Sequence, residues 1–199
     1  MKIFKTDIVM ALGIASALLL SGFRGFATDC ESVQSKVLRL HIPANSDSEY
    51  DQDIKLKLRD YILEEYSAQL ACESDITHAI AQTEALLPEI EAACNDFLAS
   101  ECAPYGAKAE LCNMHFNTRV YDNVTLPAGE YTALRITLGS GEGQNWWCVM
   151  FPPLCIPVAS EEKQTELLPD VLVSEKKNEK VEVKFALFEF FEWLANGCK

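Results

Sequence analysis

Residues 139–155, GSGEGQNWWCVMFPPLC, combine three glycines, two adjacent tryptophans, two cysteines and a Pro-Pro pair. The glycines permit a tight reversal, and residues 131–138 before them alternate as a strand. Residues 145–151 alternate as a second strand that carries large apolar groups on both sides, and Pro152-Pro153 ends its hydrogen-bond ladder. We therefore predict a hairpin here, with 145–151 as the hub of the sheet and either covered on both faces or covering a partner.

The first half of the chain predicts one strand followed by two helices. Residues 37–42 alternate as a strand that Pro43 ends, and residues 44–48 form a turn and cap. Ser48 and Asp51 have the capping-box spacing before a helix over residues 49–71. A second helix is predicted over residues 76–100, with Pro88 either kinking it or restarting it.

The remaining pattern completes a single α+β domain over residues 28–158. Residues 107–121 alternate as expected for a strand with one solvent-exposed face, and residues 124–130 are predicted to form a loop. The order predicts a mainly antiparallel sheet of about four strands with two helices packed on one face. Beyond the domain, residues 159–180 predict a charged linker, and residues 181–199 predict a C-terminal amphipathic helix that docks on the core or on a partner.

The N-terminus has the pattern of a secretory signal peptide over residues 1–27. Lys2 and Lys5 precede an apolar block over residues 8–20, and a small-x-small cleavage pattern follows it. The block is shorter than the roughly 18 residues of a membrane span, so an uncleaved anchor is the weaker interpretation. We expect a secreted protein.

The charge balance argues against a polyanionic partner. The chain has 17 basic and 30 acidic side chains and a net charge of −13, and removal of the signal segment would make it more acidic. We therefore expect no nucleic acid and no anionic membrane surface as partner.

The chain has eight cysteines, and export would allow disulfide bonds. Sequence alone cannot choose among the possible connectivities. Cys148 and Cys155 lie close together around a strand end and the Pro-Pro turn, so we predict that they pair. Cys72 and Cys102 flank a long helical region and should lie too far apart to join.

Several residues could carry chemistry. Cys148 could act as a nucleophile with His41 or His115 as base, although a disulfide half is the favoured interpretation. No histidine has a partner at a metal-ligand spacing and no Cys-x-x-Cys occurs, so we predict no metal site and no cofactor. The Trp146-Trp147 pair could bind sugar or peptide, or lie buried in the sheet. An exported cysteine hydrolase or a cell-wall-binding module is thus the alternative function.

Four runs of sequence resemble the stage II sporulation protein R family of endospore-forming bacteria. They are HIPANSDS (41–48), LPAGEYTALR (126–135), GSGEGQNWWC (139–148) and FPPLC (151–155). The resemblance implies a sporulation signalling protein, not an enzyme, exported from the forespore into the space between the forespore and mother-cell membranes. There it would activate a membrane-embedded aspartic protease that processes the sigma-E precursor. No small-molecule substrate is expected.

The family pattern, as it applies here, includes cysteines only at Cys148 and Cys155, which supports their pairing. The other six cysteines depart from it, namely Cys30, Cys72, Cys94, Cys102, Cys112 and Cys198.

We predict no catalytic residue, and a partner-binding patch at one edge of the sheet. If strands 37–42 and 145–151 are antiparallel neighbours, the polar residues after the first strand lie beside the start of the other. Trp146 would be the apolar anchor of this patch, and the two arginines would orient it. The patch consists of Asn45, Ser46, Asp47, Arg119, Arg135, Asn145 and Trp146.

Overall fold

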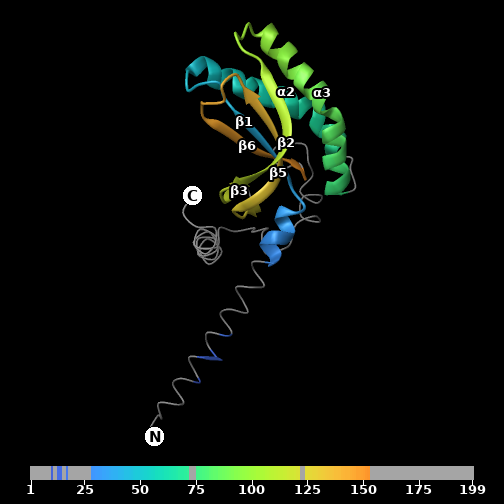
Figure 1. The fold of residues 1–199 in the computed structure, drawn as a ribbon, viewed down its shortest axis with the longest axis vertical. Coiled ribbons are helices and arrows are strands. Elements are labelled where there is room, and N and C mark those ends of the chain that lie inside the picture. The colour runs from blue at the N-terminus through green and yellow to red at the C-terminus, as the bar shows by residue number, and fades with distance from the viewer. Residues whose placement is uncertain are drawn as a thin grey trace.

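The computed structural model describes residues 10, 13–14, 17, 28–71, 75–121 and 124–152, and in this part of the chain four strands form one sheet in the order β2-β5-β1-β6 (Figure 1). They are β2 (Ala107–Phe116), β5 (Gly129–Leu138), β1 (Leu38–Pro43) and β6 (Asn145–Phe151). β1 pairs in parallel with β5, whereas the other two pairings are antiparallel. The sheet is therefore mixed, and the prediction of a mainly antiparallel sheet is wrong.

The predicted hairpin between residues 131–138 and 145–151 is also wrong, because β1 lies between β5 and β6. After β5 the chain passes the end of β1 through residues 139–144 and returns as β6 on the far side of β1. Among the described strands β6 is thus an edge strand, and β1 and β5 are the central ones. The apolar residues on both sides of β6 reflect burial on both faces of the sheet, as predicted, and not a central position.

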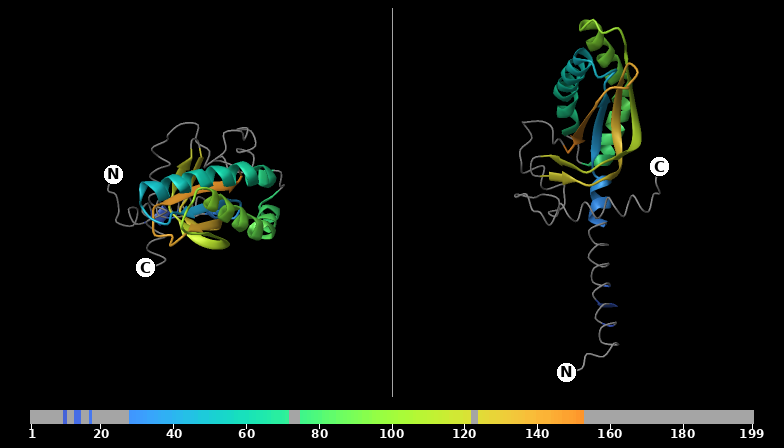
Figure 2. Two further views of the ribbon diagram at one scale, coloured as in Figure 1. Left: turned by 90° about the horizontal axis from the view of Figure 1, so that it is seen from above. Right: turned by 90° about the vertical axis from the view of Figure 1, so that its left-hand side faces the viewer.

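Two long helices pack on one face of the sheet, here called the helix face, as predicted (Figures 1 and 2). α2 (Glu49–Ala71) and α3 (Ile76–Ser100) have the bounds that the sequence predicts. The hydroxyl of Ser48 accepts a hydrogen bond from the Asp51 amide, and Asp75 caps α3 in the same way. Pro88 lies within α3, which continues past it.

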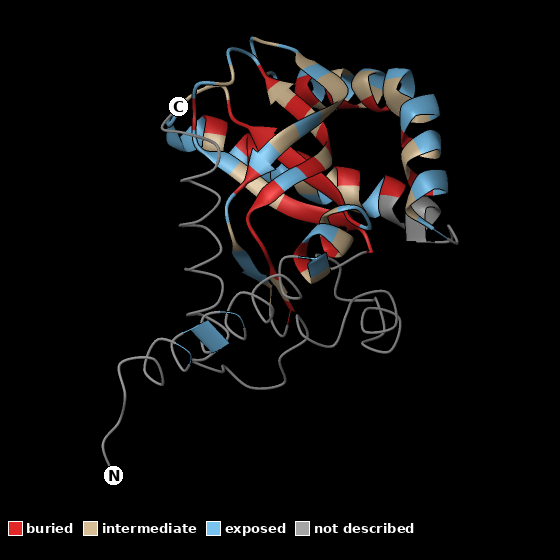
Figure 3. Cartoon of the chain, turned by 60° about the horizontal axis from the view of Figure 1, so that its bottom comes forward, coloured by how far each residue is buried: buried red, intermediate tan, exposed pale blue. Residues whose placement is uncertain are grey.

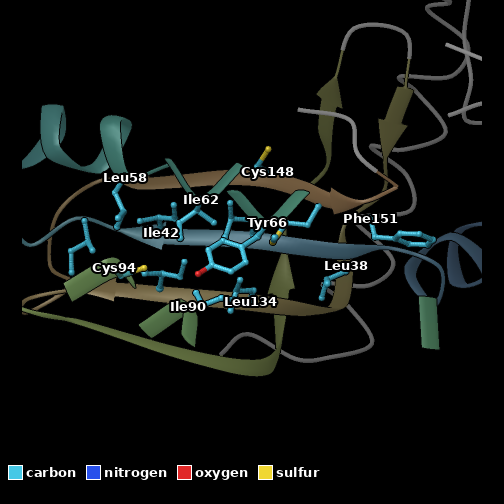
Figure 4. Close-up of a cluster of buried hydrophobic side chains, with 14 of the residues drawn as sticks. Leu38, Ile42, Leu58, Ile62, Tyr66, Ile90, Cys94, Leu134, Cys148 and Phe151 are labelled. Atoms are coloured by element: carbon cyan, nitrogen blue, oxygen red, sulfur yellow. The ribbon is translucent and has the colours of Figure 1, made fainter. Parts of the chain in front are cut away.

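The main hydrophobic core lies between these helices and the helix face (Figure 4). Leu38, Leu40 and Ile42 of β1 alternate toward it and are fully buried. Cys148 of β6 is part of the same cluster. The helices contribute Ile54, Leu58, Ile62, Tyr66, Ile90, Cys94 and Leu98. Figure 3 shows mostly buried residues along the central strands and a mixture of buried, intermediate and exposed residues along the helices.

The opposite face of the sheet, here called the second face, carries a separate core. A helical segment over residues 28–34 contributes Cys30 and Val33 to it. A small two-stranded sheet, β3 (Arg119–Tyr121) paired with β4 (Val124–Leu126), adds Val124 and Leu126. This sheet and the 28–34 segment lie at the same end of the molecule (Figures 1 and 2).

The predictions of one long strand over 107–121 and of a loop over 124–130 are both wrong in part. The strand stops at Phe116, and residues 119–121 belong to β3 instead. The predicted loop contains β4, whose Val124 and Leu126 are buried. Three residues are too short a run to show alternation, so the pattern could not reveal β4.

Other predictions fall outside the described residues. These are the charged linker over 159–180, the C-terminal helix over 181–199, Cys155 and nearly all of the signal segment. Among the residues that the structure does describe, no helix combines the length and the apolar character needed to cross a membrane.

Candidate functional site

The polar motif residues meet at one end of the sheet, where residues 44–48 contact residues 139–144. We call this contact the loop junction. Its centre is Asp51, only 4% exposed. One oxygen of Asp51 accepts hydrogen bonds from Asn45 Nδ2 and Ser46 Oγ, and the other accepts one from the Tyr105 hydroxyl. Burial alone would raise the pKa of Asp51, but these hydrogen bonds outweigh burial and hold the pKa below its ordinary value.

The two loops are joined by side chains that bond the opposite backbone. Asp47 Oδ1 accepts from the Gln144 amide at 2.7 Å, and Asn45 Oδ1 accepts from the Ser140 amide at 3.0 Å. Lys55 of α2 is almost fully buried and donates to the Gln144 carbonyl at 2.9 Å. The polar residues that looked like an open recognition surface are therefore largely engaged in holding the junction together.

Glycine is required where the two loops touch. A Cβ at Gly143 would collide with the backbone carbonyl of Ser46, and the Gly143 amide donates to the Ala44 carbonyl at 2.8 Å. Gly139 has a φ of +53°, where a side chain is strained, and its Cβ would meet the Asn45 amide group. The glycine triplet thus allows close backbone approach between the loops.

On the second face, the junction continues into a row of side chains across all four strands. The register aligns Glu110 of β2, Arg135 of β5, His41 of β1 and Trp147 of β6. The imidazole of His41 stacks on Trp147 at 4.0 Å between ring centroids, and its Nε2 lies 3.0 Å from Asn145 Oδ1. Burial lowers the pKa of His41, and nearby Arg135 lowers it further against the opposing effect of the Asn145 hydrogen bond. His41 is therefore neutral at pH 7.

The next row holds a fully buried arginine. Arg39 Nη2 donates to the Tyr121 hydroxyl at 2.8 Å, and Nε donates to the Cys148 carbonyl at 3.3 Å. Its guanidinium lies over the Phe116 ring at 4.1 Å and near the Tyr131 ring at 5.0 Å. Arg39 thus ties β3 and β6 to the centre of the sheet.

The structure brings most of the predicted patch together. β1 and β6 are antiparallel neighbours, as assumed, so Asn145 pairs with Pro43 beside the loop junction. Arg135 lies on the second face, two strands from Asn145. Trp146 faces the helices, and Arg59 of α2 lies 4.2 Å from its ring centroid.

Arg119 is exposed on β3 and belongs to the small sheet instead. Trp147, not Trp146, is the tryptophan on the second face.

The pairs suggested for catalysis are not assembled. Cys148 is fully buried on the helix face, whereas His41 lies on the second face. His115 is on β2, three strands from β6, which is about 14 Å at ordinary strand spacing. No group of three or more possible metal ligands occurs in the described part of the chain. Cys155 lies outside that part, so its pairing with Cys148 stays a prediction.

These observations define a mixed α+β domain whose motif residues join two loops at one end of the sheet. A family model described as stage II sporulation protein R matches residues 34–162. The stage II sporulation protein R of Bacillus subtilis (strain 168) is 38% identical over 149 residues, which cover 75% of this chain and 66% of that relative. The chain therefore belongs to the stage II sporulation protein R family, which supports a role in sporulation. No solved structure matches it.

Sequence reasoning missed three residues of the site. Asp51 was given no role in the patch beyond its capping-box spacing, yet it is the acceptor at the centre of the junction. No role was predicted for Lys55 or Arg39, yet both are buried. Arg39 lies between apolar residues in a short strand. A charged residue in such a run can be buried when it is paired, and this pattern could have indicated a buried arginine.

Proposed function

We propose that the protein is an exported sporulation signal that activates a membrane-embedded aspartic protease, which then processes the sigma-E precursor in the mother cell. The observation that carries this proposal is the family match over residues 34–162, which spans all four motif runs. The convergence of three of those runs on the loop junction and the neighbouring strands is consistent with one recognition surface. The protein acts by binding and contributes no catalytic residue.

The site of action in this proposal is the space between the forespore and mother-cell membranes. The signal-peptide pattern over residues 1–27 supports export. The receptor binds Asn45, Asp47 and Asn145 at the junction and Arg135 on the adjoining second face. Cys148 and Cys155 form a disulfide that fixes the end of β6, which non-reducing peptide mapping of the exported protein tests.

Co-expression in a host that does not sporulate tests the function. The host makes the sigma-E precursor and the protease, with or without this protein, and the processed fraction of the precursor is measured by immunoblot. We expect processing with the full-length protein and little without it. A variant lacking residues 1–27 is the control, because it stays in the cytoplasm and should not activate. Equal processing with and without the protein contradicts the proposal.

A further inference from the structure

The charges on the second face near the junction do not balance. Three neighbouring cross-strand rows carry Lys108, Arg135 and Arg39, and the one carboxylate among their described residues is Glu110. Glu110 is closest to Lys108, at 3.0 Å, and lies 3.9 Å from Arg135 Nη1, beyond hydrogen-bond distance. This face is thus locally cationic in a chain whose net charge is −13.

Three side-chain nitrogen atoms on this face are buried without a hydrogen-bond partner. Arg135 Nε, His41 Nδ1 and Arg39 Nη1 have no hydrogen-bond partner among the described residues. His41 is only 4% exposed, whereas the Arg135 side chain is 38% exposed and reaches solvent. Arg135 and His41 are direct neighbours in the β1–β5 register. Of these atoms only the arginine nitrogens are donors, because the neutral imidazole of His41 carries its proton on Nε2, toward Asn145 Oδ1, and its Nδ1 is an acceptor. Because a buried donor without an acceptor is costly, a carboxylate that bonds Arg135 would be bound favourably.

We propose that Arg135, with His41 beside it, is a carboxylate-binding site that receives an aspartate or glutamate side chain of the partner protein. The planar guanidinium matches the two oxygens of a carboxylate, and Arg39 adds positive charge from the neighbouring row of the sheet. The assignment of the carboxylate to the partner rests on the proposed function, whereas binding of a carboxylate as such does not.

A single carboxylate fits this face better than an extended polyanion. The local excess of positive charge spans only three rows of the sheet, and the rest of the chain is strongly acidic. A nucleic acid or an anionic lipid surface would meet that acidic remainder and be repelled. A side chain on a partner surface meets only the local field of Arg39 and Arg135.

Nuclear magnetic resonance of the exported protein tests carboxylate binding directly. Sodium acetate is titrated against sodium chloride at constant ionic strength while the Nε–H signals of the arginines are followed. We expect a saturable shift of the Arg135 signal and no comparable shift for Arg119, which is exposed on β3. We also expect acetate to raise the midpoint of the His41 ring titration. An unshifted Arg135 signal, or an equal shift at Arg119, overturns the proposal.

Charge reversal tests the assignment to the partner. Arg135→Glu is compared with Lys36→Glu, which makes the same charge change at an exposed site next to the opposite end of β1. We expect Arg135→Glu to reduce precursor processing at least tenfold relative to Lys36→Glu at equal thermal stability. If Arg135→Glu does not fold, Arg135→Gln takes its place.

Equal processing by the folded Arg135 and Lys36 variants overturns the partner assignment. If the unmutated protein itself fails to activate processing, the proposed function is wrong, and the acetate titration still decides whether Arg135 binds carboxylates.

Discussion

At the scale of single residues, the junction depends on a buried carboxylate that is fully engaged by donors. Asp51 accepts from Ser46, Asn45 and Tyr105, so removing its charge leaves several donors without an acceptor. We predict that Asp51→Asn lowers the free energy of unfolding by about 2–4 kcal/mol. Urea denaturation measures this loss. Asp53→Asn, two residues away with a side chain 62% exposed, should cost less than about 0.5 kcal/mol, and equal losses would contradict the role of Asp51.

His41 should give the stability a distinct pH dependence. Burial lowers its pKa below the ordinary value of 6.5. Between the two values the unfolded chain binds a proton that the folded protein does not, so stability decreases as the pH falls below about 6.5. We predict that His41→Gln flattens this dependence between pH 6.5 and 5, as measured by denaturation at each pH. His115→Gln, at an exposed site on β2, is the control, and an unchanged slope in His41→Gln would exclude the effect.

At the scale of elements, the position of β6 depends on close contact between the two loops. A Cβ at Gly143 would collide with the Ser46 backbone, which cannot move without breaking the junction. We predict that Gly143→Ala destabilises the domain by about 1–3 kcal/mol, the usual cost of overpacking. At Gly106 a Cβ would meet only the end of the Asn95 side chain, at 2.7 Å. Thermal melting should therefore show a smaller loss for Gly106→Ala, and the reverse order would refute the argument.

The helices were predicted more accurately than the arrangement of the strands. Both long helices were predicted with correct bounds, because Ser48 and Asp75 mark their starts chemically. The order of the strands was not predicted correctly. Alternation tells which side of a strand is buried, but it does not tell which strand lies next to it. The parallel pairing of β1 with β5 joins residues far apart in the chain, such as His41 and Arg135. No local sequence pattern predicts this pairing.

At the scale of the whole molecule, the prediction that Asn145 lies beside the loop after β1 was correct. Placing Asn145 beside the loop after β1 required only that β1 and β6 be antiparallel neighbours, and they are. The polar residues of the site were harder to assign. Asn45 and Asp47 bond the facing loop, and that fold-stabilising role could not be separated from recognition before the loops were seen together.

The proposed function requires that the surface around the loop junction activates the protease. Asn145 is exposed and bonds His41, so Asn145→Ala should cost only about 1 kcal/mol of stability. Asn113→Ala is the matched control, because Asn113 is exposed on β2 and bonds only Thr132 in the described contacts.

The decisive measurement is the processed fraction of the sigma-E precursor in the co-expression assay, with each variant shown to be exported and folded. We predict that Asn145→Ala loses most of the processing and that Asn113→Ala keeps it. Full processing with folded Asn145→Ala would contradict that requirement.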